Sequence, residues 1–240
     1  MGVKIVHDRP VMVITGTSSG IGRGMAEHFV AENYLVEGCS RGPGTLELEG
    51  YHHAQVDVGD ELQVRTWIRS IKKCHSRIDV LVCNAGLVRS ALLMSVTPGD
   101  VLDMFLKTHV KGTYYVCREV SKAMILRKYG RIITVSSLGV PLHLEGTSAY
   151  SATKSAIVEM TKILAKEVAS LGITCNVLSP ALIMTKPAKD MGQAWADRLL
   201  NKQTIKRVVT IEEICNVVSF FASPNSGCIT GQVINMGLVT

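Results

Sequence analysis

Near its beginning the chain passes from a short apolar run, through a glycine-rich turn, into an amphipathic helical pattern. The apolar run is VMVIT at 11–15, the turn is GTSSGIG at 16–22, and Met25 and Phe29 are spaced for one face of the following helix. Glycines let the backbone approach a bound group closely, and free amides at a helix N-terminus attract an anion. The segment therefore predicts a strand, a turn and a helix that can hold a pyrophosphate. Its spacing, G-x-x-x-G-x-G, differs from the general dinucleotide pattern G-x-G-x-x-G.

Strands and helices alternate along the rest of the chain. We expect further strands at 34–40, 78–83, 131–136, 174–178 and 229–236, and one that is closed by Val56-Asp57-Val58. Helices are expected at 60–74, at 100–128, from about 148 onward and at 210–222, and the mid-helix Gly112 indicates close packing. With 240 residues and a mean hydropathy of +0.23, this pattern predicts an α/β fold. The expected architecture is a single Rossmann-type, doubly wound parallel sheet of about seven strands with helices on both faces.

We predict one domain over residues 1–240. Residues 182–207 are polar and are broken by Pro187 and Gly192, so they are expected to form a mobile substrate flap with a short helix.

Four motifs each follow a predicted strand: Gly16–Gly22, Asn84-Ala85-Gly86, Ser137 and Pro180. The carboxyl ends of parallel strands meet at one edge of a sheet, and open α/β sheets bind ligands there. We therefore expect these four motifs to converge on one site.

Tyr150 and Lys154 lie four positions apart, and Ser137 lies 150 − 137 = 13 positions before the tyrosine. In a helix, the tyrosine and lysine side chains share a face one turn apart. An ammonium about 4 Å from a phenol, at an effective dielectric of about 20, would favour the phenolate by about 4 kcal/mol, or about 3 pKa units, before burial opposes it. Tyr150 could then exchange a proton with an alcohol or ketone, and Ser137 could stabilise charge on the same oxygen. Such a pair also occurs on ordinary surface helices, so this interpretation depends on the other motifs.

The second predicted strand ends in Ser40-Arg41. About 20 residues after the first glycine, an acidic residue would bind the ribose hydroxyls of NAD, whereas an arginine accommodates the additional phosphate of NADP. We therefore favour NADP(H) as the cofactor, with NAD(H) as the alternative. Alternatively, Arg41 is an ordinary surface arginine that follows a strand and binds no cofactor.

Composition and charge argue against several other classes of protein. The formal net charge is +6, but the basic residues are scattered and only 5% of residues are aromatic, which does not favour a nucleic-acid partner. We expect a cytoplasmic protein with no membrane partner, because no apolar run approaches about 20 residues and no signal-peptide pattern is present. The seven cysteines lack ligand spacing and are expected to be reduced packing residues. His52 and His53 would point to opposite faces of a strand, so no metal site is predicted.

Taken together, the motifs resemble those of the short-chain dehydrogenase/reductase family over essentially the whole chain. Thr15-Gly16 and Gly20-Ile21-Gly22 are similar to its cofactor loop, Asn84-Ala85-Gly86 to its N-A-G motif, and Ser137, Tyr150 and Lys154 to its catalytic set. Within the family, the run from Arg207 to Gln232 is most similar to bacterial 3-oxoacyl-(acyl-carrier-protein) reductases.

The resemblance implies a role for each matching residue. Tyr150 would be the general acid/base, Lys154 would lower its pKa and bind the nicotinamide ribose, and Ser137 would orient the substrate oxygen. Asp57 would meet the adenine and Asn84 the adenine ribose, while Ile183 and Thr185 would contact the carboxamide. The cofactor site would comprise Gly16, Ser18, Ser19, Gly20, Ile21, Gly22, Ser40, Arg41, Asp57, Val58, Asn84, Ala85, Gly86, Tyr150, Lys154, Pro180, Ile183 and Thr185.

Several positions depart from the family pattern. Cys83 stands where an asparagine usually precedes N-A-G and is expected to be a small buried side chain, and Ala181 replaces the glycine after Pro180. Leu171 stands where carrier-protein-dependent reductases often carry arginine. His109 replaces a catalytic-site asparagine that helps hold a water linking the lysine to solvent. We hypothesise that His109 keeps this relay with a changed pH dependence, because an imidazole can hold water and can titrate near neutrality. The alternatives are a structural histidine or weakened catalysis.

The resulting prediction is an NADPH-dependent oxidoreductase that reduces a ketone, such as a 3-oxoacyl thioester or another small carbonyl, to a secondary alcohol. The alternatives are an NAD-dependent secondary-alcohol dehydrogenase and a catalytically weak nucleotide-sensing protein. The resemblance implies a homo-oligomer, either a tetramer or a dimer. The substrate itself is not revealed, because specificity would depend on the loops at 89–95, 138–145 and 182–207.

Overall fold

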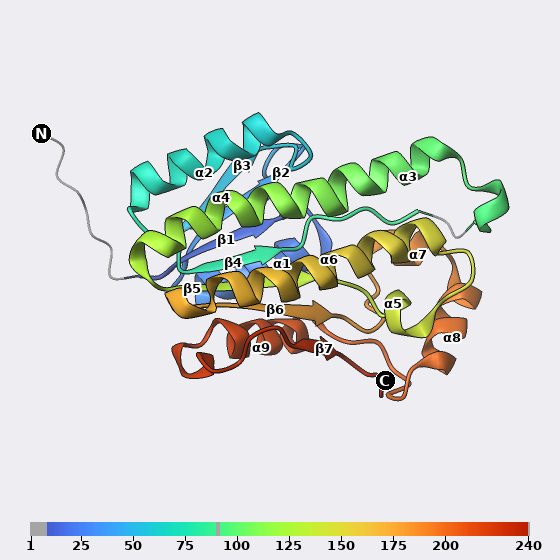
Figure 1. Cartoon of the computed structure of the whole chain (residues 1–240). Helices are drawn as coiled ribbons and strands as arrows, with labels where there is room; N and C mark the ends of the chain where they lie inside the picture. The colour runs from blue at the N-terminus through green and yellow to red at the C-terminus, as the bar shows by residue number, and fades with distance from the viewer. Residues whose placement is uncertain (1–8, 90–91, 240) are drawn as a thin grey trace, which may run out of the picture.

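The structure, a computed structural model, describes residues 9–89 and 92–239. Within these residues, seven parallel strands form one sheet in the order β3-β2-β1-β4-β5-β6-β7 (Figure 1). The strands are β1 (Val11–Thr15), β2 (Leu35–Ser40), β3 (Tyr51–Gln55), β4 (Val80–Cys83), β5 (Gly130–Val135), β6 (Ile173–Ser179) and β7 (Val233–Asn235). The strand order changes direction between β1 and β4, and such a point is where doubly wound sheets bind ligands. The predicted fold class is confirmed.

Helices cover both faces of the sheet. Helices α1 (Gly20–Ala31) and α9 (Ile211–Ala222) pack on one face, and α2 (Glu61–His75), α4 (Gly112–Arg127) and α6 (Ser148–Val168) cover the other (Figure 1). All five residues of β1 are buried because both faces are covered, which explains the continuous apolar run in the sequence. Among the described residues, no helix is both long enough and apolar enough to cross a membrane.

The predicted helix over 100–128 consists of three segments. Helix α3 (Gly99–Phe105) leads into a π-helical turn, η2 (Leu106–Lys111), and α4 continues from Gly112. A π-helical turn inserts an extra residue into the helical repeat and often occurs at a functional site. A side chain on Gly112 would lie 2.7 Å from Cγ2 of Val58, which confirms the close packing expected of this glycine.

The segment 182–207 contains two helices, α7 (Lys186–Asp190) and α8 (Gln193–Lys202), instead of the single short helix expected. Pro187 lies in the first turn of α7, where its missing N–H costs nothing, and Gly192 precedes α8 with a φ of +88°. Both residues therefore start a helix instead of breaking one. Leu182 and Leu199 pack with Leu138 in a small apolar cluster, so residues 182–207 contact the segment that follows β5.

Two strands end differently from the prediction. Strand β3 stops at Gln55, and Val56 and Val58 pack into the core beyond it. Strand β7 is shorter than predicted: Gly231, with a φ of +70°, interrupts the extended backbone before it, although the N–H of Gly231 and the carbonyl of Gln232 still bond to β6. The side chain of Asn176 on β6 satisfies two further backbone groups of this segment. Its Nδ2 donates to the carbonyl of Ile229, and its Oδ1 accepts the N–H of Gln232.

The seven cysteines are all free thiols. Five of them are buried, and they belong to the apolar cores on the two faces of the sheet, as expected of packing residues. Cys74 and Cys228 are exposed, so for these two the packing interpretation is wrong.

Candidate active site

A cleft of about 900 Å³ runs along the carboxyl edge of the sheet. The segments after β1, β4, β5 and β6 all line it, so the predicted convergence of the four motifs is confirmed. The predicted site residues in its walls are Gly16, Ser18, Ser19, Gly20, Ile21, Ser40, Arg41, Asp57, Val58, Asn84, Ala85, Gly86, Ser137, Tyr150, Lys154, Pro180, Ile183 and Thr185. Gly22 and His109 do not line the cleft. Each contacts a residue that does, Gly22 the carbonyl oxygen of Gly16 and His109 the N–H of Leu87.

The turn after β1 is held open by glycines and supported from behind. Gly16 and Gly20 have φ angles of +79° and +58°, a region that favours glycine, and a side chain on Gly22 would collide with the carbonyl oxygen of Gly16. Nδ2 of Asn84 donates to the carbonyl oxygen of Thr15 at 3.0 Å, and Oγ1 of Thr15 accepts the N–H of Asn84 at 3.0 Å. The N-A-G motif thus fixes the turn, and the bare backbone that faces the cleft fits the pyrophosphate of a dinucleotide.

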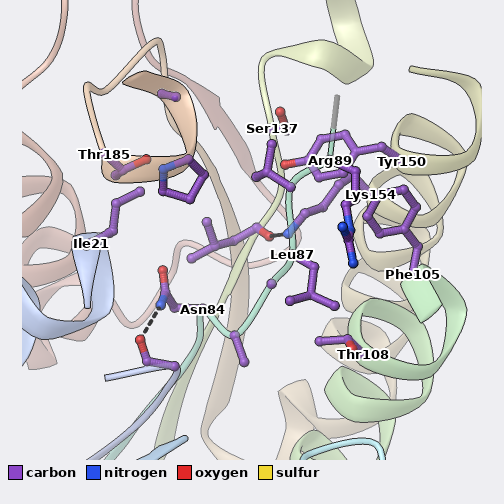
Figure 2. Close-up of a pocket in the computed structure, with 18 of the residues that line it drawn as sticks. Ile21, Asn84, Leu87, Arg89, Phe105, Thr108, Ser137, Tyr150, Lys154 and Thr185 are labelled. Atoms are coloured by element: carbon purple, nitrogen blue, oxygen red, sulfur yellow. Dashed lines mark hydrogen bonds between the residues drawn. The ribbon is translucent and has the colours of Figure 1, made fainter. Parts of the chain in front are cut away.

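Ser137, Tyr150 and Lys154 meet at the other end of the cleft (Figure 2). Ser137 follows β5, while Tyr150 and Lys154 lie one turn apart on α6, as predicted. A hydrogen bond joins the hydroxyls of Ser137 and Tyr150. Nζ of Lys154 lies 5.9 Å from the centroid of the Tyr150 ring and donates to the carbonyl oxygen of Val135 at 2.9 Å. Strand β5 therefore orients both the serine and the buried ammonium.

Burial sets the protonation states of this group. It raises the pKa of Tyr150 above its usual range, and the hydrogen bond with Ser137 offsets only part of that rise. Burial also lowers the pKa of Lys154 to about 8. The expected lowering of the tyrosine pKa is therefore wrong for the chain without bound cofactor, because removal of the phenol from water dominates. Tyr150 is a protonated phenol at neutral pH, which is the form that a proton donor needs.

His109, in the π-helical turn, is completely buried behind Tyr150. Its Nε2 accepts the backbone N–H of Leu87 at 2.9 Å, so its Nδ1 carries the proton and donates to Oγ1 of Thr153 at 2.9 Å. That hydroxyl donates in turn to the carbonyl oxygen of Tyr150 at 2.7 Å. Burial, and then the charge of Lys154, lower the pKa of His109 to about 3. The hypothesis that His109 titrates near neutrality is therefore wrong, and both of its ring nitrogens bind protein groups, as a structural histidine would.

The rings of Phe105, His109 and Tyr150 form one cluster. Phe105 and His109 stack with centroids 5.2 Å apart, and Tyr150 meets them edge-on at 5.7 and 5.5 Å. Sequence reasoning missed both Phe105 and Thr153, although the i, i+3 spacing of Thr153 from Tyr150 is a signal that could have found the threonine. The cluster fixes the orientation of the Tyr150 ring from behind.

The opposite end of the cleft is lined by Ser40 and Arg41 at the end of β2. Oγ of Ser40 donates to the carbonyl oxygen of Gly42 at 2.9 Å, which closes a tight turn, and Arg41 is exposed. Nearby, Asp57 pairs with Nζ of Lys107 at 2.7 Å. Although burial opposes it, the bonds from Lys107 and from the Gly59 N–H hold the pKa of Asp57 below its usual range.

A chain of polar side chains, which sequence reasoning missed, supports this turn from below. Nδ1 of His53 lies 2.8 Å from Oη of Tyr51, and Tyr51 donates to Oγ1 of Thr17 at 2.8 Å. Nε2 of His53 donates to the carbonyl oxygen of Gly42 at 3.2 Å and lies 3.1 Å from Oγ of Ser40. His53 thereby connects the turn at 40–44 with the glycine-rich turn.

Apolar side chains surround the end of the cleft that contains Ser137, Tyr150 and Lys154, the proposed catalytic end. They come mainly from the predicted specificity segments 138–145 and 182–207, together with α3. The segment 89–95 contributes Arg89 and Leu92, while its residues 90 and 91 lie outside the described part of the chain. The apolar side chains in this part of the wall are Leu92, Val101, Phe105, Leu138, Leu144, Leu182, Met191, Trp195 and Leu199.

Two departures from the family pattern have packing roles. Cys83 is buried, with its Sγ 3.7 Å from Sγ of Cys117, which confirms the expected small buried side chain. Ala181 is also buried, in the core on the α1 and α9 face.

Comparison with known proteins agrees with this geometry. Residues 16–237 match the short-chain dehydrogenase model described as enoyl-(acyl carrier protein) reductase. The 3-oxoacyl-(acyl-carrier-protein) reductase FabG of Buchnera aphidicola is 31% identical over 236 residues, which cover 95% of this chain and 96% of the relative. FabG of Escherichia coli is 30% identical over 232 residues, covering 94% and 95% of the two chains.

Solved structures share the fold over nearly the whole length. ElxO with NADP bound is 28% identical, with a TM-score of 0.88 over 94% of this chain and 96% of that chain. Levodione reductase, at 24% identity and a TM-score of 0.90 over 95% and 96%, has the same fold. Because the family model matches residues 16–237, and relatives of 31% and 30% identity cover 95% and 94% of the chain, this chain belongs to the short-chain dehydrogenase/reductase family of NAD(P)-dependent oxidoreductases.

Proposed function

We propose that this chain is an NADPH-dependent reductase that converts a ketone to a secondary alcohol, with Tyr150 as the proton donor. The observation that carries the proposal is the arrangement of Ser137, Tyr150 and Lys154 at one end of a cleft that also contains the glycine-rich turn.

The cofactor would lie along the cleft with its pyrophosphate against residues 16–22. At the end of β2, the exposed guanidinium of Arg41 suits the additional phosphate of NADPH, and Ser40 lies beside it. The related ElxO was solved with NADP bound, which supports NADP(H) over NAD(H). When bound, the cofactor would supply the hydride. Ile183 and Thr185, after Pro180, would hold its carboxamide.

The chain's own residues handle the proton. The Tyr150 hydroxyl donates its proton to the ketone oxygen as the carbonyl carbon is reduced, and the Ser137 hydroxyl donates a hydrogen bond to the same oxygen. The buried ammonium of Lys154 stabilises the phenolate that remains. His109 holds the backbone of Tyr150 through Thr153, so it is a positioning residue and not a catalytic one.

We assign the substrate to carbonyl compounds that carry an apolar group next to the reacting carbon. The apolar wall at the catalytic end supports this assignment, and the FabG relatives favour a 3-oxoacyl thioester within the class. Leu171, in place of an arginine, argues against dependence on a carrier protein, so a small free thioester or ketone is the better test substrate.

The test is a screen of ketones and acyl thioesters for NADPH consumption, followed by Tyr150→Phe. We expect this variant to bind NADPH with unchanged affinity and to lose about 100- to 10,000-fold in kcat. Tyr114→Phe, at an exposed tyrosine on α4, is the matched control and should retain full activity. Full activity in Tyr150→Phe, or no consumption with any carbonyl, would contradict the proposal.

We also propose that the chain forms a homo-oligomer, a tetramer or a dimer. Exposed apolar side chains on α4 and α6, namely Leu126 and Ile163, support this proposal. Sedimentation of the purified chain as a monomer at micromolar concentration would refute it.

A further inference from the structure

Outside the cleft, three side chains on the α2 face of the sheet bring metal-ligating atoms to one point. Glu37 lies on β2, His52 lies directly opposite it on β3, and His75 ends α2. Nε2 of His75 is 2.6 Å and Nδ1 of His52 is 3.2 Å from the same carboxylate oxygen, Oε1 of Glu37. All three ligand atoms lie within 4.8 Å of one another.

The group is built into the fold on one side and open to solvent on the other. The side chains of Glu37 and His75 are only 12% and 5% exposed, whereas that of His52 is 62% exposed. Immediately after His75, Ser76 adopts a φ of +61° and ends α2, so the position of His75 is set by the helix end. Two ligands are thus held by the protein, and the third can adjust.

The distances suit a small divalent cation. With bonds of about 2.0–2.2 Å and tetrahedral angles, the ligands of Zn²⁺ lie about 3.3 Å from one another. The separation of 3.2 Å between His52 and Glu37 already matches, and the contact between His75 and Glu37 would open by about 0.7 Å. Two imidazoles and a carboxylate are a donor set that zinc and neighbouring transition metals accept.

We propose that Glu37, His52 and His75 bind one divalent transition-metal ion, represented by Zn²⁺, with water from the open side completing its coordination. Strand β3 is an edge strand of the sheet, and the ion would tie it and β2 to α2. The site therefore stabilises the fold, and it is independent of the proposed reductase activity. The sequence prediction of no metal site considered only the pair His52-His53, which do point to opposite faces; the ligands come together through the sheet register and α2.

The test uses the full chain after treatment with EDTA. Titration with Co²⁺ should produce visible absorption that saturates at one ion per chain, and Zn²⁺ should displace the Co²⁺. Zn²⁺ at about 100 times its Kd should raise Tm by about 5 °C or more, because an ion that binds only the folded chain stabilises it.

Variants identify the ligands. His52→Gln removes an exposed ligand without disturbing the core, and it should weaken Zn²⁺ binding at least tenfold and abolish the Tm shift. His75→Gln should have the same effect. Cys74→Ser, which removes the exposed thiol next to His75, and His28→Gln on α1 are controls that should bind as the parent chain does. Absence of a saturable Co²⁺ signal, a Tm shift retained in His52→Gln, or loss of binding in Cys74→Ser would each overturn the proposal.

Discussion

The two ends of the cleft are each supported by a histidine, and the two histidines work differently. At the catalytic end, His109 is completely buried and stacks on Phe105, and its two ring nitrogens bond to the N–H of Leu87 and the hydroxyl of Thr153. At the cofactor end, His53 is half-buried on an edge strand and holds the turn that carries Ser40 and Arg41.

This difference follows from position in the sheet. The proposed catalytic residues and His109 lie over the central strands, where burial shifts their pKa values. The pKa of Tyr150 rises, and those of Lys154 and His109 fall to about 8 and about 3. The residues at the edge instead hold the shape of a turn. We therefore expect changes at the catalytic end to alter turnover and pH dependence, and changes at the cofactor end to alter cofactor affinity.

The largest effect should come from Lys154→Met. Without the ammonium, the phenolate left after proton donation loses its stabilising charge, so kcat should fall about 1,000-fold. Because the pKa of Lys154 is about 8, kcat/KM for NADPH in the parent enzyme should decrease as the pH rises through about 8. The measurement is the pH profile of NADPH consumption.

Below pH 8 the buried ammonium of Lys154 destabilises the fold, because the unfolded chain binds that proton more strongly than the folded chain does. Lys154→Met removes this buried charge, so the variant should still fold. Lys162→Met, at an exposed lysine of the same helix, is the matched control. If Lys154→Met kept more than a tenth of the parent kcat, the proposed role of the lysine would be lost.

The next largest effect concerns His109→Asn and acid stability. The pKa of His109 is lowered to about 3 in the folded chain, so the unfolded chain, with a pKa of about 6.5, binds more protons between these values. Stability is therefore lost as the pH falls below about 6.5. Between pH 7 and pH 5 this loss amounts to about 2 kcal/mol, and His109→Asn should not show it.

Urea unfolding at the two pH values measures the difference, and the parent chain and variant should have the same dependence between pH 7 and pH 8. The pH–rate profile near neutrality should also stay unchanged in His109→Asn. An equal loss of stability in parent and variant from pH 7 to pH 5 would show that His109 is protonated in the fold.

Much of the fold was predictable, because its signals are local. The buried run at 11–15, the helical spacing around Met25 and Phe29, and the alternation of strands with helices fix a doubly wound sheet before any tertiary contact is known. The errors occur where tertiary packing decides the outcome. The π-helical turn at 106–111 and the short strand β7 depend on partners that come from distant parts of the chain.

The candidate site shows the same division. Ser137, Tyr150 and Lys154 stand at strand ends or at helical spacing, so their convergence could be inferred, and the structure brings them together. The direction of the pKa shift of Tyr150 could not be inferred from the sequence, because it depends on how completely the folded chain removes the phenol from water. The support from His53 and the metal-ligand group at Glu37 depend on the register between β2 and β3, which no local pattern in this sequence specifies.

A smaller effect is expected from His53→Ala at the cofactor end. The substitution removes the donor to the Gly42 carbonyl and the contact with Tyr51, so the turn that carries Arg41 loses its support. We expect the Kd for NADPH to rise about tenfold, the worth of one to two hydrogen bonds, while the Kd for NADH and kcat stay unchanged. His52→Ala in metal-free buffer is the matched control. Equal weakening of NADPH and NADH would mean that His53 supports the glycine-rich turn and not the phosphate site.

The smallest effect should come from Lys107→Met, which removes the ion pair with Asp57. Both partners are partly exposed, with 54% and 27% of their side chains accessible, so solvent screens the pair and its contribution to stability should stay below about 1 kcal/mol. Asp57 would be free to turn toward the adenine, and both NADPH and NADH should bind with a Kd within about threefold of the parent value. A fluorescence titration with each cofactor measures this. A tenfold change in the Kd of either cofactor would mean that a single substitution at the cofactor end has a large effect, as it does at the catalytic end. The contrast between the two ends would then be wrong.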